Sequence, residues 1–150
     1  MATGKELETT GNLEGTAATF ALTVEGERQT LSPNLQDEVY RIALELLRNA
    51  FRHACARRVE TEVRYDEEQL RVRIRDDGKG MDPEILKKGR RAGHWGLLGA
   101  KERAQRIGAH LDIWSEAGAG TEIQLRIPAA VAYENSHNRP RFRFFRKGGR

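Results

Sequence analysis

The sequence predicts one domain of the α/β class, in which strands and helices share a core. Several short stretches alternate apolar and polar side chains, a pattern typical of strands with one buried face. Two longer stretches repeat apolar residues at helical spacing. The length of 150 residues suits a single domain with a sizeable core. No apolar run is long enough to span a membrane and no signal-peptide core is present, so we expect a cytoplasmic protein.

The cysteine content and the charge distribution add to this expectation. The single Cys55 excludes an internal disulfide and fits a reducing compartment, although the cytoplasmic part of a membrane-anchored protein would look the same. The formal net charge is +4, but six of the 26 basic side chains lie in residues 139–150, which carry no acid. The remaining 20 are outnumbered by 22 acidic side chains. The basic character therefore belongs to a tail.

The first half of the chain predicts a strand, a long helix and a hairpin. Residues 19–24 alternate and end at a Glu-Gly turn, which predicts a strand. Ser32 can cap the helix and Pro33 suits its first position. Residues 59–65 and 69–75 alternate again and are expected to pair across the three residues between them. The apolar stripe of the helix consists of Leu35, Val39, Ile42, Ala43, Leu46 and Ala50.

The second half predicts two helices followed by two strands. A short helix is expected at residues 82–86, where Asp-Pro can start it, and a longer one at 96–107. Gly108 is well placed to end the longer helix. Residues 111–115 and 121–127 are expected to form the last strands, separated by a glycine-rich turn.

The expected domain occupies residues 16–130. Residues 1–15 are polar and glycine-bearing, so we interpret them as a linker. Pro128 is expected to end the fold, and residues 131–150 are expected to form a disordered basic tail.

The strand at residues 69–75 leads into the stretch Arg-Asp-Asp-Gly-Lys-Gly. Asp76 has the parity of the apolar residues before it, so its carboxylate should face the apolar side, where an unpaired charge is costly. Gly78 and Gly80 let the backbone turn and approach a ligand closely. These features suit a flat polar ligand with an exocyclic amine. The alternative is an Asp-Gly turn in which Asp76 only caps its own loop.

Three polar residues on the long helix, Glu45, Asn49 and His53, are spaced four apart. They form one row at the edge of the apolar stripe. Glu45 could orient or deprotonate a water or hydroxyl, Asn49 offers an oxygen ligand suited to Mg²⁺, and His53 could touch a phosphate. The alternative is a border row that merely solvates the helix.

A second glycine-rich stretch, residues 93–99, runs into the helix expected at 96–107. Four basic side chains precede it, and free N–H groups at a helix start favour anions. It matches neither the Walker pattern nor the dinucleotide fingerprint, so a plain loop is an alternative. Thr121 opens the last strand with the parity of its apolar residues, although a threonine at a strand start is also ordinary.

The order of these patterns is more specific than any one of them. The chain reads E-x-x-x-N-A-x-x-H, D-D-G-K-G, G-H-W-G-L-x-G-x-x-E-R-A and G-A-G-T. This order resembles the histidine-kinase-type (GHKL) ATPase superfamily, which also contains type II topoisomerases and certain chaperones and mismatch-repair ATPases. The helix at residues 101–108 is similar to that of bacterial two-component sensor kinases that pair with LuxR-type regulators. The resemblance covers roughly residues 17–128.

The resemblance implies a fold and a binding site. The fold would be a two-layer sandwich, with a mixed, largely antiparallel sheet, about three helices on one face, and ATP between the layers. By motif position Asn49 would hold Mg²⁺, and Asp76 would accept a hydrogen bond from the adenine amine with Thr121 nearby. Glu45 and His53 would be the catalytic candidates. The other residues implied at the nucleotide are Gly78, Gly80 and Met81 in the loop, and Gly93, His94, Gly96, Leu97 and Leu98 in a phosphate-facing lid.

The resemblance also implies a function, the ATP-binding catalytic domain of a sensor histidine kinase. The family's dimerisation helices and phospho-accepting histidine should lie N-terminal to such a domain, and residues 1–15 are too short and glycine-rich to supply them. The expected partners are therefore the dimerisation domain of a parent kinase and a downstream response regulator. One alternative is an anti-sigma-type serine kinase. Another is a nucleic-acid-binding module that uses the basic aromatic tail at 139–147, although we expect this tail to be disordered, and a contact with a membrane surface is a further alternative.

Overall fold

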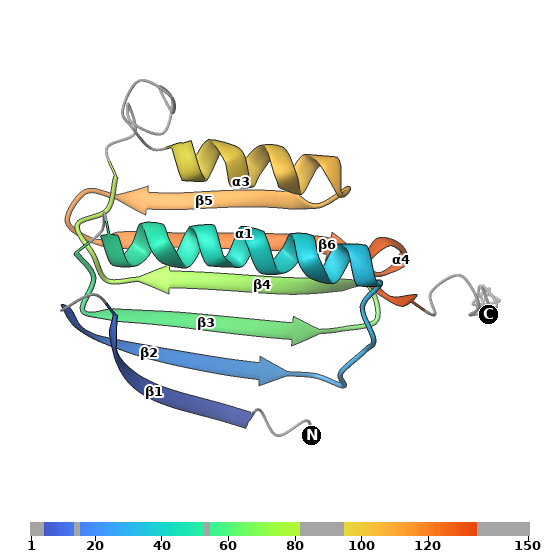
Figure 1. Ribbon diagram of the computed structural model, residues 1–150, viewed down its shortest axis with the longest axis horizontal. Helices are drawn as coiled ribbons and strands as arrows, with labels where there is room; N and C mark the ends of the chain where they lie inside the picture. Colours follow the sequence, from blue (N-terminus) through green and yellow to red (C-terminus); the bar gives the residue numbers. More distant parts are fainter. Residues whose placement is uncertain (1–4, 14–15, 53–54, 82–94, 135–150) are drawn as a thin grey trace, which may run out of the picture.

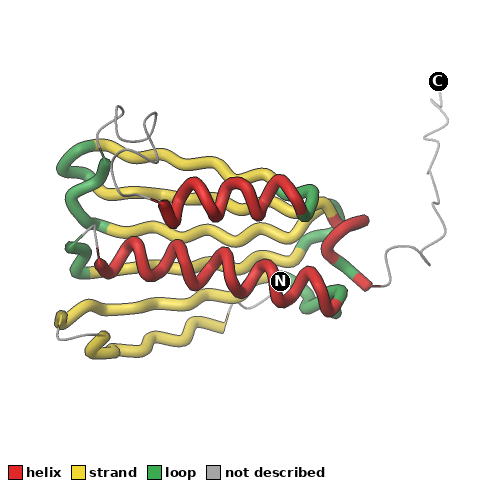
Figure 2. The backbone as a smooth tube through the Cα atoms, turned by 45° about the horizontal axis from the view of Figure 1, so that its top comes forward, coloured by secondary structure: helices red, strands yellow, loops and turns green. Residues whose placement is uncertain are grey.

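The computed structural model describes residues 5–13, 16–52, 55–81 and 95–134, which form one sheet with helices on one face (Figures 1 and 2). The strands lie in the order β1-β2-β3-β4-β6-β5. Only β2 and β3 are parallel; the other neighbours are antiparallel, so the predicted mixed, largely antiparallel sheet is confirmed. The strands are β1 (Lys5–Leu13), β2 (Thr16–Glu25), β3 (Arg58–Tyr65), β4 (Gln69–Asp76), β5 (His110–Glu116) and β6 (Gly120–Pro128). The helices are α1 (Pro33–Arg52), α3 (Trp95–Arg106) and α4 (Ala129–Ala132).

The inner face of the sheet is built from rows of side chains that cross the strands. The register between β3, β4, β6 and β5 sets the inward-facing residues of each strand opposite those of its neighbour, and most of them are apolar. Most of these side chains are buried in the core. From the middle of the sheet toward one end, the rows are Val63–Val72–Leu125–Leu111 and Thr61–Ile74–Ile123–Ile113.

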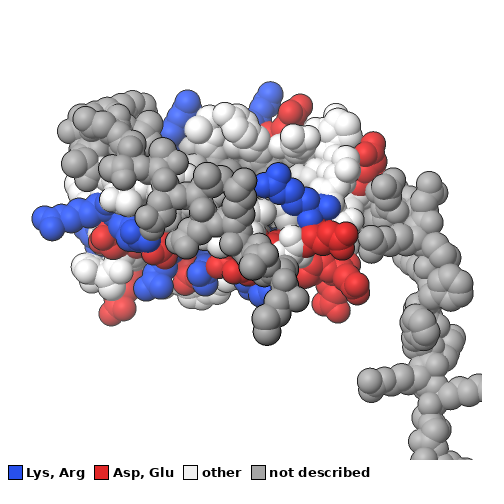
Figure 3. Space-filling view, turned by 90° about the horizontal axis from the view of Figure 1, so that it is seen from below, with Lys and Arg blue, Asp and Glu red and all other residues white. Residues whose placement is uncertain are grey.

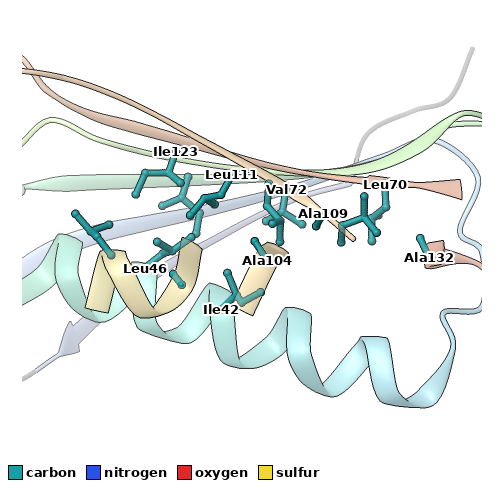
Figure 4. Packing of buried hydrophobic residues seen from close by; sticks show 14 of the residues in the cluster. Ile42, Leu46, Leu70, Val72, Ala104, Ala109, Leu111, Ile123 and Ala132 are labelled. Carbon is teal, nitrogen blue, oxygen red and sulfur yellow. The ribbon is translucent and has the colours of Figure 1, made fainter. Parts of the chain in front are cut away.

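The two long helices close this core. Ile42 and Leu46 of α1 point toward the sheet beside Ala104 of α3 (Figure 4). Ala104 is fully buried, and its small side chain lets α3 lie close to its neighbours. The helix predicted at 96–107 is confirmed and ends as expected. The N–H of Gly108 donates to Gln105 and that of Ala109 donates to Ala104, which is the Schellman pattern.

The N-terminal segment corrects one expectation. Residues 5–13 are not a linker but strand β1, which pairs with β2 along its whole length. The segment lacks an apolar period, yet an edge strand needs only backbone N–H and C=O groups to pair. The absence of periodicity was therefore the wrong criterion at the sheet edge.

The C-terminal end of the fold corrects a second expectation. The fold continues beyond Pro128 through α4 to Tyr133, which is 6% exposed. The Tyr133 hydroxyl lies 2.9 Å from the carbonyl oxygen of Asp66 and 3.0 Å from that of Gln69, at the β3–β4 turn. Its ring stacks on Tyr65. Residues 135–150 of the expected tail, and the short helix expected at 82–86, lie outside the described residues.

The outer face of the sheet carries a network of ion pairs. Glu62 of β3 lies 2.9 Å from Arg71 and 3.2 Å from Arg73 of β4. Arg73 in turn lies 3.5 Å from Glu122 of β6. In Figure 3, acidic and basic side chains are interspersed along one side of the molecule. These side chains are only partly buried, so each pair contributes little stability and this face is in contact with solvent.

Candidate functional site

The predicted site residues gather at one end of the sheet. The C-terminal ends of α1, β4 and β5 meet there with the first residues of α3 and β6 (Figure 1). The last row of the inner face at this end is Val59–Asp76–Thr121–Ser115. Three neighbouring strands therefore carry polar side chains at this end of a face that is mostly apolar.

Asp76 is buried at the centre of this row, as its parity predicted. It is 6% exposed, and its Oδ1 atom accepts a hydrogen bond from the N–H of Gly78 at 2.9 Å. Burial raises the pKa of the Asp76 carboxyl above its usual value, and the N–H groups of Gly78 and Thr121 offset only part of this. Within the described residues no cation pairs with it. Asp76 thus caps its own loop, as the alternative proposed, and still leaves a buried acid without a counter-charge.

Thr121 and Ser115 share a hydrogen bond beside Asp76. Thr121 is 7% exposed and lies directly opposite Asp76 in the sheet. Its Oγ1 lies 2.8 Å from Oγ of Ser115, which also accepts from the N–H of Met81 at 2.7 Å. Sequence reasoning missed Ser115. The available signal was its parity, which puts a polar side chain on the apolar face of the predicted strand 111–115.

Two glycines allow the loop after β4 to lie in close contact with the β5–β6 turn. Gly80 has φ +67°, and a Cβ there would collide with the carbonyl oxygen of Glu116. Gly120 has φ +98°, and a Cβ there would collide with the carbonyl oxygen of Asp76. Both conformations strongly favour glycine. These two residues therefore let the loop after β4 and the β5–β6 turn pack against each other beside the carboxylate.

An open cleft of about 650 Å³ lies at the ends of β4, β5 and β6. Its lining combines Asp76, Ser115 and Thr121 of the inner face with Trp114 and Glu122, whose register places them on the outer face. Small-molecule sites commonly have volumes of about 300–1,000 Å³. The cleft therefore has the volume of a small-molecule site and borders the buried row.

Asn49 brings an unpaired polar group to the same end of the molecule. It lies half-buried in the last turns of α1. Its Nδ2 atom is enclosed and finds no hydrogen-bond partner within the part of the chain that the structure describes. A buried amide without a partner is costly, which marks the side chain as available to a ligand.

Glu45 lies one turn earlier and faces α3. Its Oε2 atom is enclosed without a hydrogen bond among the described residues and lies 3.9 Å from Nε of Arg103. Arg103 also reaches Glu38, at 4.0 Å. Sequence reasoning missed Arg103, and only the contact between α1 and α3 reveals it. The Glu45 carboxylate is therefore balanced by a cation on the neighbouring helix.

The comparison with known protein families bears on this geometry. The sequence profile described as "Histidine kinase-, DNA gyrase B-, and HSP90-like ATPase" matches residues 34–131. The chain belongs to this ATPase family. The predicted resemblance is thus confirmed, and the polar row lies inside the matched region.

The similar curated proteins are bacterial sensor kinases. The sensor histidine kinase LiaS of Bacillus subtilis is 36% identical over 98 residues, which cover 65% of this chain and 26% of LiaS. The histidine-protein kinase/phosphatase DegS of the same organism is 31% identical, with 71% of this chain and 28% of DegS covered. The chain therefore spans about a quarter of the length of these relatives.

A solved structure supports the family fold. The histidine kinase domain of the blue-light activated kinase EL346 from Erythrobacter litoralis matches with a TM-score of 0.59 and 26% identity. The match covers 76% of this chain and 53% of that one.

Among the described helices of the present chain, none is both long and apolar enough to cross a membrane.

The first residues of α3 carry the described part of the lid predicted from the ATPase resemblance. Gly96 lies in the first turn, Leu97 is buried in the core, and Leu98 is half-buried. Leu97 could therefore reach a phosphate only through its backbone N–H, which belongs to the first turn, where N–H groups lack intrahelical partners. The other lid residues, Gly93 and His94, lie outside the described residues, as does His53.

A magnesium ion fits this ATPase site through one protein ligand. No cluster of three or more His, Cys, Asp or Glu that could hold a metal occurs within the described residues. Mg²⁺ needs no such cluster, because it commonly takes one or two protein oxygens together with substrate phosphates and water. The side chain of Asn49, whose amide nitrogen has no hydrogen-bond partner among the residues that the structure describes, carries an oxygen of the kind such an ion binds.

Proposed function

We propose that this chain is the ATP-binding catalytic domain of a two-component sensor histidine kinase. In this role it transfers the γ-phosphate of ATP to a histidine on the dimerisation domain of its parent kinase, and a response regulator acts downstream. The observation that carries the proposal is the buried Asp76 carboxylate, which has no counter-charge within the described residues and belongs to a residue that lines a cleft beside Thr121. An exocyclic amine of adenine would satisfy it.

Different residues around the cleft contact different parts of ATP. Asp76 accepts from the adenine amine, and Thr121 contacts the ring nearby. Gly78, Gly80 and Met81 form the wall beside the base. The N–H groups at the start of α3 contact the phosphates, which is favoured because the first turn of α3 contains no acidic residue.

Asn49 and Glu45 serve the phosphate end of the site. Asn49 supplies an oxygen ligand to Mg²⁺, which when bound neutralises phosphate charge and orients the γ-phosphate. Glu45 holds the attacking group in place, and the nearby Arg103 offsets the charge of its carboxylate. His53, Gly93 and His94 complete the proposed set at the phosphates. Phosphoryl transfer needs chiefly positioning and charge stabilisation, and this arrangement provides both.

Two measurements test the proposal. Calorimetry should detect ATP binding that is strengthened by Mg²⁺. With γ-labelled ATP and a histidine-bearing dimerisation domain as acceptor, label should appear on the acceptor and be lost in acid. Acid-stable label would indicate a serine kinase instead, and no binding of ATP with or without Mg²⁺ would refute the proposal.

A further inference from the structure

Ser115 makes a hydrogen-bond pattern that no prediction of the site included. Its Oγ atom lies 2.7 Å from the N atom of Met81, 2.8 Å from Oγ1 of Thr121 and 3.2 Å from the carbonyl oxygen of Gly120. The three groups come from the loop after β4 and from the start of β6. Ser115 therefore links both chain segments that border the cleft.

The hydrogens available limit how this cluster can be arranged. The N–H of Met81 can only donate, so Ser115 accepts from it. The single hydrogen of Ser115 then goes either to Thr121 or to the carbonyl of Gly120. The distance to Thr121 is 2.8 Å, the common value for O–H···O bonds, whereas that to Gly120 is longer. When Ser115 donates to Thr121, the hydrogen of Thr121 is free to point into the cleft.

We propose that Ser115 is a positioning residue that makes the Thr121 hydroxyl a hydrogen-bond donor toward the bound base. The inference rests on the proposed ATP site and deepens it. Asp76, beside Thr121, is an acceptor, so the pair presents an acceptor next to a donor. Adenine offers the complementary edge, an amine next to a ring nitrogen, whereas guanine and hypoxanthine carry a carbonyl in place of that amine.

This chain of hydrogen bonds gives Ser115 a role beyond packing. A chain from Met81 N–H through Ser115 to Thr121 polarises each hydroxyl in the same direction, which strengthens the last donor. Without Ser115, Thr121 loses its fixed donor and its hydroxyl rotates freely. The selectivity for adenine would then fall although Asp76 is intact.

The test compares ATP with 1-deaza-ATP and 7-deaza-ATP, which keep the amine and each lack one ring nitrogen next to it. For the unmodified chain, calorimetry should give one analogue a Kd about five- to tenfold above that of ATP, as expected for one hydrogen bond. In Ser115→Ala this ratio should fall toward one, as it should in Thr121→Val. The double variant should match Thr121→Val alone, because Ser115 acts through Thr121.

Ser115→Thr is the matched control, because it keeps the hydroxyl and should keep the ratio. If thermal unfolding shows that Ser115→Ala is not folded, Ser115→Cys, whose thiol is a weak donor, is measured in its place. Equal weakening of all three nucleotides would mean that Ser115 is only structural, and it would overturn the inference. So would an unmodified chain that binds ATP but neither analogue more weakly. If the unmodified chain binds no nucleotide, the proposed function itself fails, and this inference fails with it.

Discussion

Replacing Asp76 with asparagine removes one charge from the buried row and leaves the shape of the side chain almost unchanged. The asparagine oxygen can still accept from the N–H of Gly78, as Oδ1 of Asp76 does at 2.9 Å. What changes is the charge that burial penalises and the acceptor that we propose for the adenine amine. The variant therefore separates the cost of the carboxylate in the free protein from its benefit in binding.

The free protein should be at least as stable with asparagine at neutral pH. Burial raises the pKa of Asp76 above its ordinary value of 3.8, so the folded state holds this proton more tightly than the unfolded state. Stability therefore falls as the pH rises from near 3.8 to the raised pKa, and stays lower above it. Each pH unit of that interval costs about 1.4 kcal/mol. Since 1 kcal/mol changes Tm by about 2–4 °C in a chain of this size, the difference is measurable.

ATP affinity should fall in Asp76→Asn, although the stability of the free protein should not. An amide is a weaker acceptor than a carboxylate and can turn an N–H donor toward the adenine amine. Losing a hydrogen bond to a charged group costs about 1.5–3 kcal/mol. This corresponds to a Kd about 10- to 150-fold higher.

Thermal unfolding between pH 3 and pH 8 and calorimetry with ATP measure the two effects. Asp77→Asn is the matched control, because it removes the same charge from an exposed position and keeps the oxygen that accepts from the N–H groups of Arg57 and Arg58. The charge of Asp77 is the smallest of the causes that raise the pKa of Asp76, so this control should change the pH dependence much less than Asp76→Asn and should leave the affinity nearly unchanged. A stability gain that does not depend on pH, or an unchanged ATP affinity in Asp76→Asn, would refute the reasoning.

Other positions give sharper single tests. Asn49→Ala should weaken Mg²⁺-ATP much more than metal-free ATP in calorimetry, whereas Asn34→Ala, on the exposed first turn of α1, should weaken neither; equal losses would make Asn49 structural. Gly80→Ala should lower the free energy of unfolding by more than about 1–2 kcal/mol, which is the cost of the left-handed backbone alone, because the new Cβ would also collide with a carbonyl oxygen. Gly118→Ala shares the positive φ but has open space, so a comparable loss in thermal unfolding would contradict the steric argument. Tyr133→Phe should cost about 1 kcal/mol in denaturant unfolding and leave ATP affinity unchanged, since its hydroxyl serves the far end of the sheet; reduced affinity would show coupling along the sheet.

The sequence predicted the core and the centre of the site because period-2 alternation carries both. The alternation from Leu70 to Ile74 set the parity of Asp76, and the same rule placed Thr121 on the inner face. Both are buried as expected. Local patterns of this kind depend on neighbours in sequence, which a single sequence displays.

Other features could not be predicted because they depend on partners far along the chain. Strand β1 is held by backbone pairing with β2, which leaves no trace in the type of side chain. Arg103 reaches Glu45 only because α3 packs against α1. Ser115 accepts from Met81, 34 residues earlier, and this contact exists only once the sheet has formed. Long-range contacts of this kind become visible only in the folded chain.

The two adjacent acids after β4 show how position, and not residue type, decides function. Asp76 and Asp77 are identical in chemistry, but successive side chains of a strand point to opposite faces. Asp77 is exposed, and its Oδ1 lies 2.8 Å and 2.9 Å from the N atoms of Arg57 and Arg58, so it ties the start of β3 to the end of β4. That tie supports the register of β3 and β4 that puts Asp76 opposite Val59. The outer acid therefore supports the geometry in which the inner acid remains buried and available to a ligand.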